Sequence, residues 1–453
     1  MDPADKPTAL AVETNGMPPQ DTSLEKNPSH APSDEKTDVS IAEDSSPKVR
    51  PPDCAYGWIP TLAVCINYMF MFGASNSYGV FSTYYLNERF VGTPATTLAW
   101  IGTLIPTMML GCNIVTGALA DKLGFRRTAY VGTVLCSLAY ILASFANQVW
   151  QLILTQGVLF GIGASFLFAP SVSIPPQWFV KYRGIANGIA VAGSSFGGLW
   201  FTAATQAMLD NLGAAWALRI LGILTFVVTG VMNMFYQRRV PAKPRKNLFE
   251  LKAFRSMTFW LIAIEGAAIY VGYWAVTFYV GTAALQLGGT SRDGSNLLLA
   301  LNAGSAIGRI GAGYIADKAG NINTLVVSDV LAVVIQMSIW MTAKSIGQLY
   351  ALCILYGMFS PTFISINAVI VATYFDQDIL ASVMGMANMF AGVGGLAGNL
   401  SQGHIVDHYD KRQGFNNTII FSAMFILFSG IVVYLLRVHV IRKSDNKRFL
   451  QKV

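Results

Sequence analysis

"GALADKLG" spans Gly117–Gly124, and "GYIADKAG" spans Gly313–Gly320, 196 positions further along the chain. Two other pairs of short stretches keep this offset: "LFG" at Leu159–Gly161 with "LYG" at Leu355–Gly357, and "WF" at Trp178–Phe179 with "YF" at Tyr374–Phe375. One offset shared by three separated places is not expected by chance. The sequence therefore predicts that its two halves are repeats of one structural unit.

The chain of 453 residues is 53% hydrophobic and only 12% charged. That charged share is about half of what an average soluble protein carries. Its apolar runs are about 20 residues long, the length of helix that crosses ~30 Å of hydrocarbon. We expect an all-α membrane protein with twelve transmembrane helices in two pseudo-symmetric six-helix bundles. The expected spans are 58–82, 97–119, 128–146, 150–174, 184–206, 215–236, 257–281, 295–316, 324–343, 347–372, 380–402 and 416–437.

The polar stretches divide the chain around these spans. Residues 1–53 carry eleven acidic and five basic residues and have no long apolar run, so they predict a disordered cytoplasmic tail. The other predicted parts are an N-terminal bundle at 54–236, a cytoplasmic linker at 237–256, a C-terminal bundle at 257–437 and a cytoplasmic tail at 438–453.

Basic residues set the expected orientation, because they favour the cytoplasmic side of a membrane. Seven of them lie in the linker at 237–256, and others lie in loops on the same side, so both termini are predicted to be cytoplasmic. Because the basic excess adjoins the spans, the bilayer is the expected partner and nucleic acid is not. We expect a monomer in the plasma membrane, with a vacuolar or other endomembrane as the alternative.

The sequence predicts neither an enzyme nor a cofactor. Its five cysteines are scattered without CxxC or Cys/His spacing, so no metal site is expected. Neither a catalytic triad nor a nucleotide-binding loop is visible, because the glycine-rich stretches lie inside apolar runs.

Four motifs resemble those of the major facilitator superfamily and, within it, of the fungal branch of the monocarboxylate-transporter-like family. They are "DCAYGW" at Asp53–Trp58, "GALADKLGFRR" at Gly117–Arg127, "WFVKYRGIANGIAVAGSSFGG" at Trp178–Gly198 and "SAIGRIGAGYIAD" at Ser305–Asp317. The resemblance covers about residues 53–437. It implies the twelve-span fold and the transport of an organic solute, and members of the fungal branch are associated with varied solutes, riboflavin among them.

Two positions depart from the proton-coupled lactate carriers that this family contains. Asn76 stands where those carriers have a lysine in the first span, and Ser305 stands where they have an aspartate one turn before an arginine. That arginine is kept here as Arg309. The resemblance therefore favours lactate–proton symport less than it favours transport of another organic solute.

Arg309 is a permanent charge inside an apolar span. It lies eight residues before Asp317, hence ~12 Å from the end of its helix, where exposure to lipid costs at least ~2.5–3.5 kcal/mol. We expect it to face a central cavity, where its planar guanidinium suits a carboxylate of the substrate. The alternative is a structural ion pair with Glu265, which lies at a similar depth in the preceding span. Glu265 is also the candidate for proton coupling, because burial and a neighbouring charge alter the protonation of a carboxylate.

Uncharged polar and aromatic residues in the spans complete the candidate substrate site: Asn76, Tyr270, Tyr273, Trp274, Asn302 and Asn367. Hydrogen bonds between helices, worth ~0.6 kcal/mol each, are the alternative use of such residues. The candidate gate consists of charged residues near the cytoplasmic ends of spans: Asp121, Lys122, Arg126, Arg127, Arg183, Asp317 and Lys318. Its alternative is a solvated run of charges.

The sequence as a whole predicts a secondary active transporter that works by alternating access. The expected partners are a small organic solute, taken to be a monocarboxylate or other organic anion, and H⁺. The alternative is a facilitator or exporter of a larger neutral or aromatic solute, such as a vitamin or secondary metabolite. A third hypothesis is a nutrient receptor that binds its ligand without transporting it.

Overall fold

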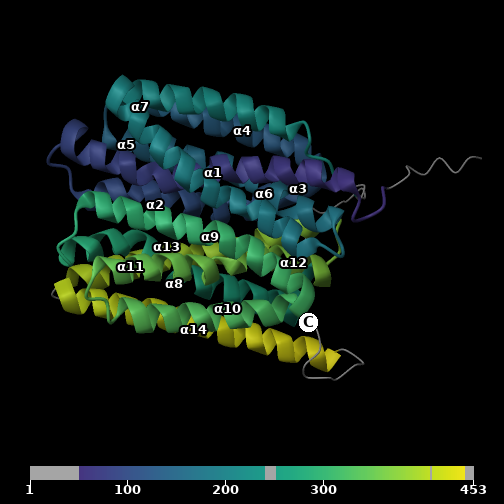
Figure 1. The fold of residues 1–453 in the computed structure, drawn as a ribbon. Helices are drawn as coiled ribbons and strands as arrows, with labels where there is room; N and C mark the ends of the chain where they lie inside the picture. Colours follow the sequence, from purple (N-terminus) through teal and green to yellow (C-terminus); the bar gives the residue numbers. More distant parts are fainter. Residues whose placement is uncertain (1–49, 240–250, 409–410, 444–453) are drawn as a thin grey trace, which may run out of the picture. The chain divides into compact units, whose positions relative to one another are not determined.

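The computed structural model describes residues 50–239, 251–408 and 411–443, and within these ranges it contains helices and no strands. These residues belong to one unit of the chain, Val49–Val453. The long helices run roughly along one common direction (Figure 1). Most of the predicted tail at 1–53, the linker residues 240–250 and residues 444–453 lie outside the described ranges.

The first half contains the helical segments of the first six predicted spans. They are η1 Ala55–Gly57, α1 Trp58–Tyr84, η2 Tyr85–Arg89, α2 Ala95–Gly111, α3 Asn113–Leu123, α4 Phe125–Ala143, α5 Val149–Leu152, η3 Ile153–Leu159, α6 Phe160–Trp178 and α7 Arg183–Asn233. Helices α2 and α3 form one predicted span that bends by 45°. Helix α7 contains two predicted spans, which meet at Gly213. Gly213 has a φ of 78°, a backbone conformation that glycine adopts without steric cost.

The second half contains the segments of the other six predicted spans. They are η4 Leu251–Arg255, α8 Met257–Gln286, α9 Ser291–Ala319, α10 Asn321–Ile335, η5 Gln336–Trp340, α11 Ile346–Phe359, α12 Thr362–Tyr374, α13 Leu380–His408 and α14 Lys411–Lys443. Helices α11 and α12 share one predicted span. Helix α14 ends at Lys443, so residues 438–443 are helical where the sequence analysis placed a tail. Helices of the described residues thus cover all twelve predicted spans.

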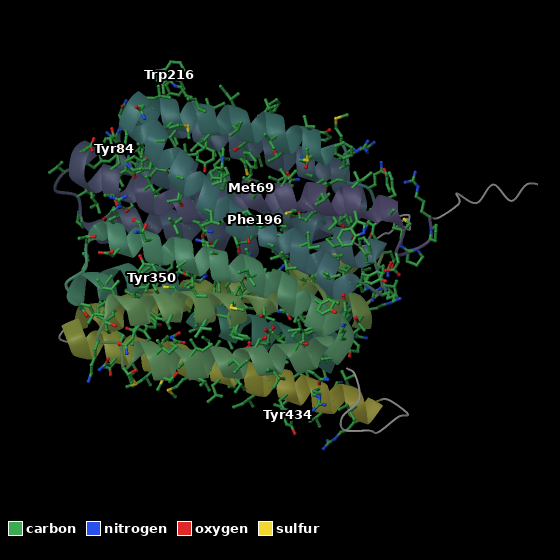
Figure 2. All side chains as sticks on the ribbon, in the orientation of Figure 1. Met69, Tyr84, Phe196, Trp216, Tyr350 and Tyr434 are labelled. Carbon is green, nitrogen blue, oxygen red and sulfur yellow. The ribbon has the colours of Figure 1, made fainter. Side chains whose placement is uncertain are left out.

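The apolar surface of these helices fits a lipid environment. Eight helical stretches of the described residues are long and apolar enough to cross a membrane, or nine with the bent α2–α3 pair. One of the eight, α7, contains two predicted spans, whereas α4 and α9 are not among them. Large apolar side chains such as Trp216 and Tyr434 project away from their neighbouring helices (Figure 2) and are 57% and 42% exposed. Such exposure is costly in water and favourable against lipid.

The two repeated motifs form equivalent contacts between the halves, where α3 packs on α13 and α7 packs on α9. A Cβ atom on Gly117 would lie 2.2 Å from the carbonyl oxygen of Ala381, and one on Gly313 would lie 2.2 Å from that of Gly184. Each motif therefore needs glycine where two backbones approach closely. The 196-residue repeat of the sequence is thus also a repeat of the structure.

Close backbone contact also joins α1 to α7 within the first half. A Cβ atom on Gly193 would lie 1.9 Å from the carbonyl oxygen of Cys65. Gly79, on α1, has open space at its Cβ position. These two helical glycines differ in what an added methyl group would meet.

We predict that Gly193→Ala strongly destabilises the protein, because the backbones of α1 and α7 must separate to admit the methyl group. Gly79→Ala is the matched control, and it is expected to leave stability unchanged or to raise it by up to about 1 kcal/mol through helix propensity. The measurement is the Tm of the purified full-length protein in detergent. Equal Tm values for both variants would contradict the packing described.

Candidate functional site

A cavity with about 610 Å³ of empty space lies between the two halves. Its walls come from α1 and α7 of the first half and from α8, α9, α11 and α12 of the second. Six of the seven predicted substrate-binding residues line it: Asn76, Tyr270, Tyr273, Trp274, Asn302 and Arg309. The structure therefore brings together residues that are up to 233 positions apart in the sequence. Their roles in binding stay predictions.

Arg309 joins the two halves at this cavity and is only 4% exposed. Its Nη1 donates a hydrogen bond of 2.9 Å to the backbone carbonyl of Val191 and another to the hydroxyl of Ser194, both on α7. Its Nε has no hydrogen-bond partner among the described residues. The guanidinium thus has a buried donor group without a partner in the described residues.

Glu265 does not neutralise Arg309. The described residues include no ion pair between these two side chains. Glu265 instead accepts a hydrogen bond of 2.7 Å from the side-chain amide of Asn367. The structural ion pair considered in the sequence analysis is therefore not formed. Asn367 lines a second cavity, of about 450 Å³, which shares Tyr270 with the first.

Aromatic rings form one wall of the main cavity. Tyr270, Tyr273 and Trp274 lie three and four residues apart on α8, so they occupy one face of that helix. The ring of Tyr270 lies 5.0 Å from that of Phe363, and the ring of Tyr273 lies 5.1 Å from that of Trp274. This wall offers ring faces and edges to a flat, unsaturated ligand.

The opposite side of the cavity is polar and uncharged. A Cβ atom on Gly198 would lie 2.7 Å from Oδ1 of Asn302 and 2.9 Å from Nδ2 of Asn76, so both amides converge on this glycine of α7. Ser305 receives a hydrogen bond of 2.9 Å from the hydroxyl of Ser195. The two positions at which the sequence departs from lactate carriers therefore supply neutral groups to the cavity.

Two carboxylates join the halves at one end of the helices. Asp317, near the end of α9, accepts hydrogen bonds of 2.7 and 2.9 Å from the backbone N–H groups of Gly184 and Ile185. Asp121, at the equivalent position of the first repeat, accepts hydrogen bonds of 2.7 and 2.6 Å from the backbone N–H and the hydroxyl of Ser382. These donors belong to the first turns of α7 and α13, where the helix dipole favours negative charge. We call Asp121, Asp317 and these two helix starts the carboxylate gate.

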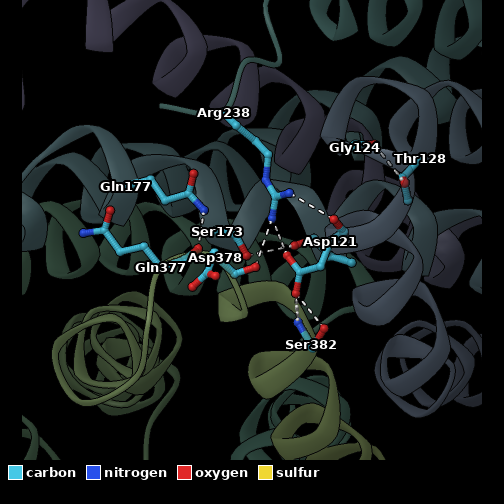
Figure 3. Close-up of polar contacts among 10 residues, drawn as sticks. Asp121, Gly124, Thr128, Ser173, Gln177, Arg238, Gln377, Asp378 and Ser382 are labelled. Atoms are coloured by element: carbon cyan, nitrogen blue, oxygen red, sulfur yellow. Dashed lines mark hydrogen bonds and ion pairs between the residues drawn. The ribbon is translucent and has the colours of Figure 1, made fainter. Parts of the chain in front are cut away.

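Arg238 reinforces the carboxylate gate from the segment that follows α7 (Figure 3). Its Nη2 forms an ion pair of 2.5 Å with Oδ1 of Asp121 and donates to the backbone carbonyl of Asp378 at 3.4 Å. Its Nη1 donates to the backbone carbonyl of Asp121 at 3.0 Å, and its guanidinium lies 4.3 Å from the ring centre of Phe125. Arg238 thus contacts both halves.

Arg183 and Asp53 support the same end. Arg183 donates from Nε to the carbonyl of Phe179 at 2.8 Å, and from Nη1 across to Ala372 of the second half at 3.5 Å. The carboxylate of Asp53 accepts hydrogen bonds from three consecutive backbone N–H groups, residues 180–182, at 3.1 to 3.4 Å. The "DCAYGW" stretch therefore ties the start of α1 to the start of α7.

Four of the predicted gate residues do not bridge the halves in the described part of the chain. Lys122 and Arg127 are exposed at the surface. Arg126 is also exposed and donates a hydrogen bond to the carbonyl of Met234 in its own half. Lys318 donates to the hydroxyl of Tyr314 one turn earlier on its own helix. Asp121, Asp317 and Arg183 do contact the other half, and a gating role for any of the seven residues stays a prediction.

The sequence analysis missed three residues of this site. Arg238 was counted only for orientation, and Ser194 and Ser382 were not selected. Nothing local in the sequence pairs Arg238 with a carboxylate 117 positions away. The signal that was available is the repeated aspartate itself, because a buried carboxylate requires donors from whatever packs against it.

Two helical repeats with a cavity between them and a gate at one end form the architecture of a multi-pass membrane transporter. Residues 62–353 match the family model described as Major Facilitator Superfamily, and the chain belongs to this superfamily. The protein is accordingly a transporter and not an enzyme.

Relatives and solved structures agree with this family. The chain is 31% identical over 396 residues to the "MFS-type transporter pynF" of Aspergillus niger, which covers 86% of this chain and 90% of that protein. It is 30% identical to the "Aspyridones efflux protein apdF" of Emericella nidulans, over 80% of this chain and 74% of that protein. The crystal structure of the human organic anion transporter MFSD10 matches with a TM-score of 0.66 at 13% identity, over 85% of this chain and all of that chain. At that identity, the last match shows the fold alone.

We predict that Asp317→Asn weakens the carboxylate gate, because an amide offers less negative charge to the start of α7. Spin labels at positions 122 and 318, one exposed residue in each half, report the opening of this end. With the five native cysteines replaced, the distance distribution between the labels is expected to gain a longer component.

Asp293→Asn is the matched control, since Asp293 caps the other end of α9 through Thr290. It is expected to leave the distribution unchanged. A distribution for Asp317→Asn that equals that of the parent protein would show that Asp317 does not hold the halves together.

Proposed function

We propose that this protein exports an aromatic organic molecule that carries a carboxylate or another planar acceptor group. The observation that supports this most directly is Arg309, which is buried at the cavity without a carboxylate partner and lies near an aromatic wall. The guanidinium provides directional donors for a planar anion, and the rings provide stacking surface for its unsaturated body. The aspyridones efflux activity in the name of a relative supports the direction of transport.

The residues that line this cavity suit an aromatic solute better than a small aliphatic monocarboxylate such as lactate. Lactate is aliphatic and gains little from the three rings on α8, and Asn76 and Ser305 take the places of the charged residues of lactate carriers. The sequence analysis considered the exporter of a secondary metabolite as an alternative, and we now prefer it. The resemblance to the monocarboxylate-transporter-like family then indicates common ancestry and not the substrate.

The transport mechanism that we propose is alternating access. The carboxylate gate closes one end of the two halves, and this end carries the basic residues that favour the cytoplasm. The arrangement thus corresponds to a state closed toward the cytoplasm, and breaking the gate opens that side. We place the protein in the plasma membrane, with both termini in the cytoplasm, as a monomer.

Proton coupling is part of the proposal, with Glu265 as the coupling residue. Its carboxylate is 2% exposed and has one hydrogen-bond donor, Asn367, at the second cavity. Because a buried carboxylate without a cationic partner is much less costly when neutral, it provides a place for a proton. The chain also has no nucleotide-binding loop, so a gradient is the expected source of energy.

A counterflow assay in proteoliposomes tests the substrate class with three probes: carboxyfluorescein as an aromatic carboxylate, lactate as a small monocarboxylate and riboflavin as a neutral aromatic vitamin. We expect carboxyfluorescein to accumulate above the level of empty liposomes and lactate to remain at that level. Transport of lactate without either aromatic probe would contradict the proposal. Transport of riboflavin alone would remove the requirement for an anion.

We predict that Arg309→Lys lowers carboxyfluorescein transport by about tenfold or more, since one charged hydrogen bond contributes roughly 1.5–3 kcal/mol. Lysine keeps the charge but loses the planar fork. Arg219→Lys is the matched control, because Arg219 packs on Phe145 and Trp216 away from the cavity. Unchanged transport by Arg309→Lys would contradict a role for this guanidinium in binding.

A further inference from the structure

A second buried carboxylate, which the sequence analysis did not select, lies in the second half. Asp329, on α10, is 1% exposed. The hydroxyl of Ser429 on α14 donates to its Oδ2 at 3.2 Å, and its Oδ1 has no hydrogen-bond partner. An aspartate that is this buried normally accepts several hydrogen bonds or pairs with a cation. Asp329 has one neutral donor.

Glu265 is in the same situation on α8. It is 2% exposed, its Oε2 accepts from Asn367, and its Oε1 has no partner. Both α8 and α10 pack on α14, and Asp329 is close enough to Glu265 for the two carboxylates to interact electrostatically. Glu265 and Asp329 belong to one six-helix bundle. Their shared environment therefore disfavours the ionised form of each carboxyl group.

The neighbouring elements supply no positive charge to this pair in the described part of the chain. Asp329 accepts from Ser429 of α14 and interacts electrostatically with Tyr356 of α11 and Glu265 of α8. Glu265 accepts from Asn367 of α12 and interacts electrostatically with Tyr270 of α8. Arg309 of α9, which packs on both α8 and α10, donates to α7 of the other half and interacts with Tyr273 and Tyr270 instead of with Glu265.

These surroundings favour the binding of a proton to one of the two carboxylates. One unpaired buried anion is already costly, and a second anion that interacts with it adds repulsion. Uptake of H⁺ by one carboxyl oxygen removes one charge and provides an O–H donor, while the other carboxylate retains an acceptor. We propose that Glu265 and Asp329 form a shared proton-binding site in the C-terminal bundle, which holds at least one proton at neutral pH.

The surroundings of the pair connect it to both cavities. Tyr356, which interacts electrostatically with Asp329, lines the main cavity and directs its hydroxyl to the carbonyl of Tyr273 at 3.4 Å. Asn367, the partner of Glu265, lines the second cavity. This inference deepens the proposed coupling at Glu265 and rests on it for its use in transport, but not for the presence of the proton.

Infrared spectroscopy tests the proton directly, because a protonated carboxyl group has a C=O stretching band that a carboxylate lacks. The sample is the purified full-length protein in lipid nanodiscs at pH 7, without substrate. We expect wild-type protein to show this band and the double variant Glu265→Gln/Asp329→Asn to lose it. Both substitutions keep the shape and the hydrogen-bonding capacity of the side chains.

The matched control is the double variant Asp210→Asn/Asp293→Asn, which removes two carboxylates from exposed positions near the other end of the helices and is expected to keep the band. The absence of the band in wild-type protein, or its persistence in the Glu265/Asp329 double variant, would overturn the proposal. If that double variant does not fold, the single variants Glu265→Gln and Asp329→Asn replace it. A band that is the same in both single variants and in wild-type protein would equally overturn it.

The result is independent of the proposed substrate. Because no ligand is added, failure of carboxyfluorescein transport leaves the expected infrared band unchanged. Conversely, transport could require Arg309 while the infrared band is absent. That result would support the substrate site at the cavity and contradict the proton-binding site.

Discussion

The permanent positive charge of Arg309 constrains the whole molecule, because it lies in the middle of an apolar helix. Arg309 stays protonated under all physiological conditions, so its helix cannot turn this side chain to lipid without a large cost. The structure accommodates it at the contact between α7 and α9, where a carbonyl and a hydroxyl of the other half accept its hydrogen bonds. The main cavity lies at the same contact, and Arg309 is one of its lining residues. The carboxylate gate then closes one end of the same contact.

The repeat explains why the gate has two equivalent parts. Gly117 and Gly313 let backbones of opposite halves approach, and Asp121 and Asp317, four residues later in each repeat, cap the helix that has come close. The final glycines of the two motifs, Gly124 and Gly320, have φ values of 92° and 99°, which let the chain turn sharply at the ends of α3 and α9. The glycines and aspartates kept by the repeat therefore have a steric or electrostatic reason. At Asp121, Arg238 adds an ion pair to this scheme.

Much of this arrangement follows from the sequence, because the cost of exposing charge or backbone to lipid is large and local. The length of the apolar runs predicts the membrane spans, and an arginine inside a span predicts a cavity next to it. Contacts between residues far apart in the sequence are harder to predict, since they depend on which side chains meet in three dimensions. Arg238 with Asp121 is one case, and Glu265 with Asn367 instead of Arg309 is another. Asp329 was overlooked because a single acid in an apolar run carries no sign of its neighbours.

The central claim is that Arg309 faces a wet space between the halves, and thiol accessibility tests it most directly. Arg309→Cys and Ile307→Cys are placed singly in a chain without its native cysteines, and intact vesicles are treated with a charged, membrane-impermeant thiol reagent. The two positions lie two residues apart on α9, where Arg309 is 4% and Ile307 62% exposed in the protein without its lipid. The account predicts labelling at 309 and none at 307, where the side chain faces acyl chains. Labelling at 307 with none at 309 would contradict it.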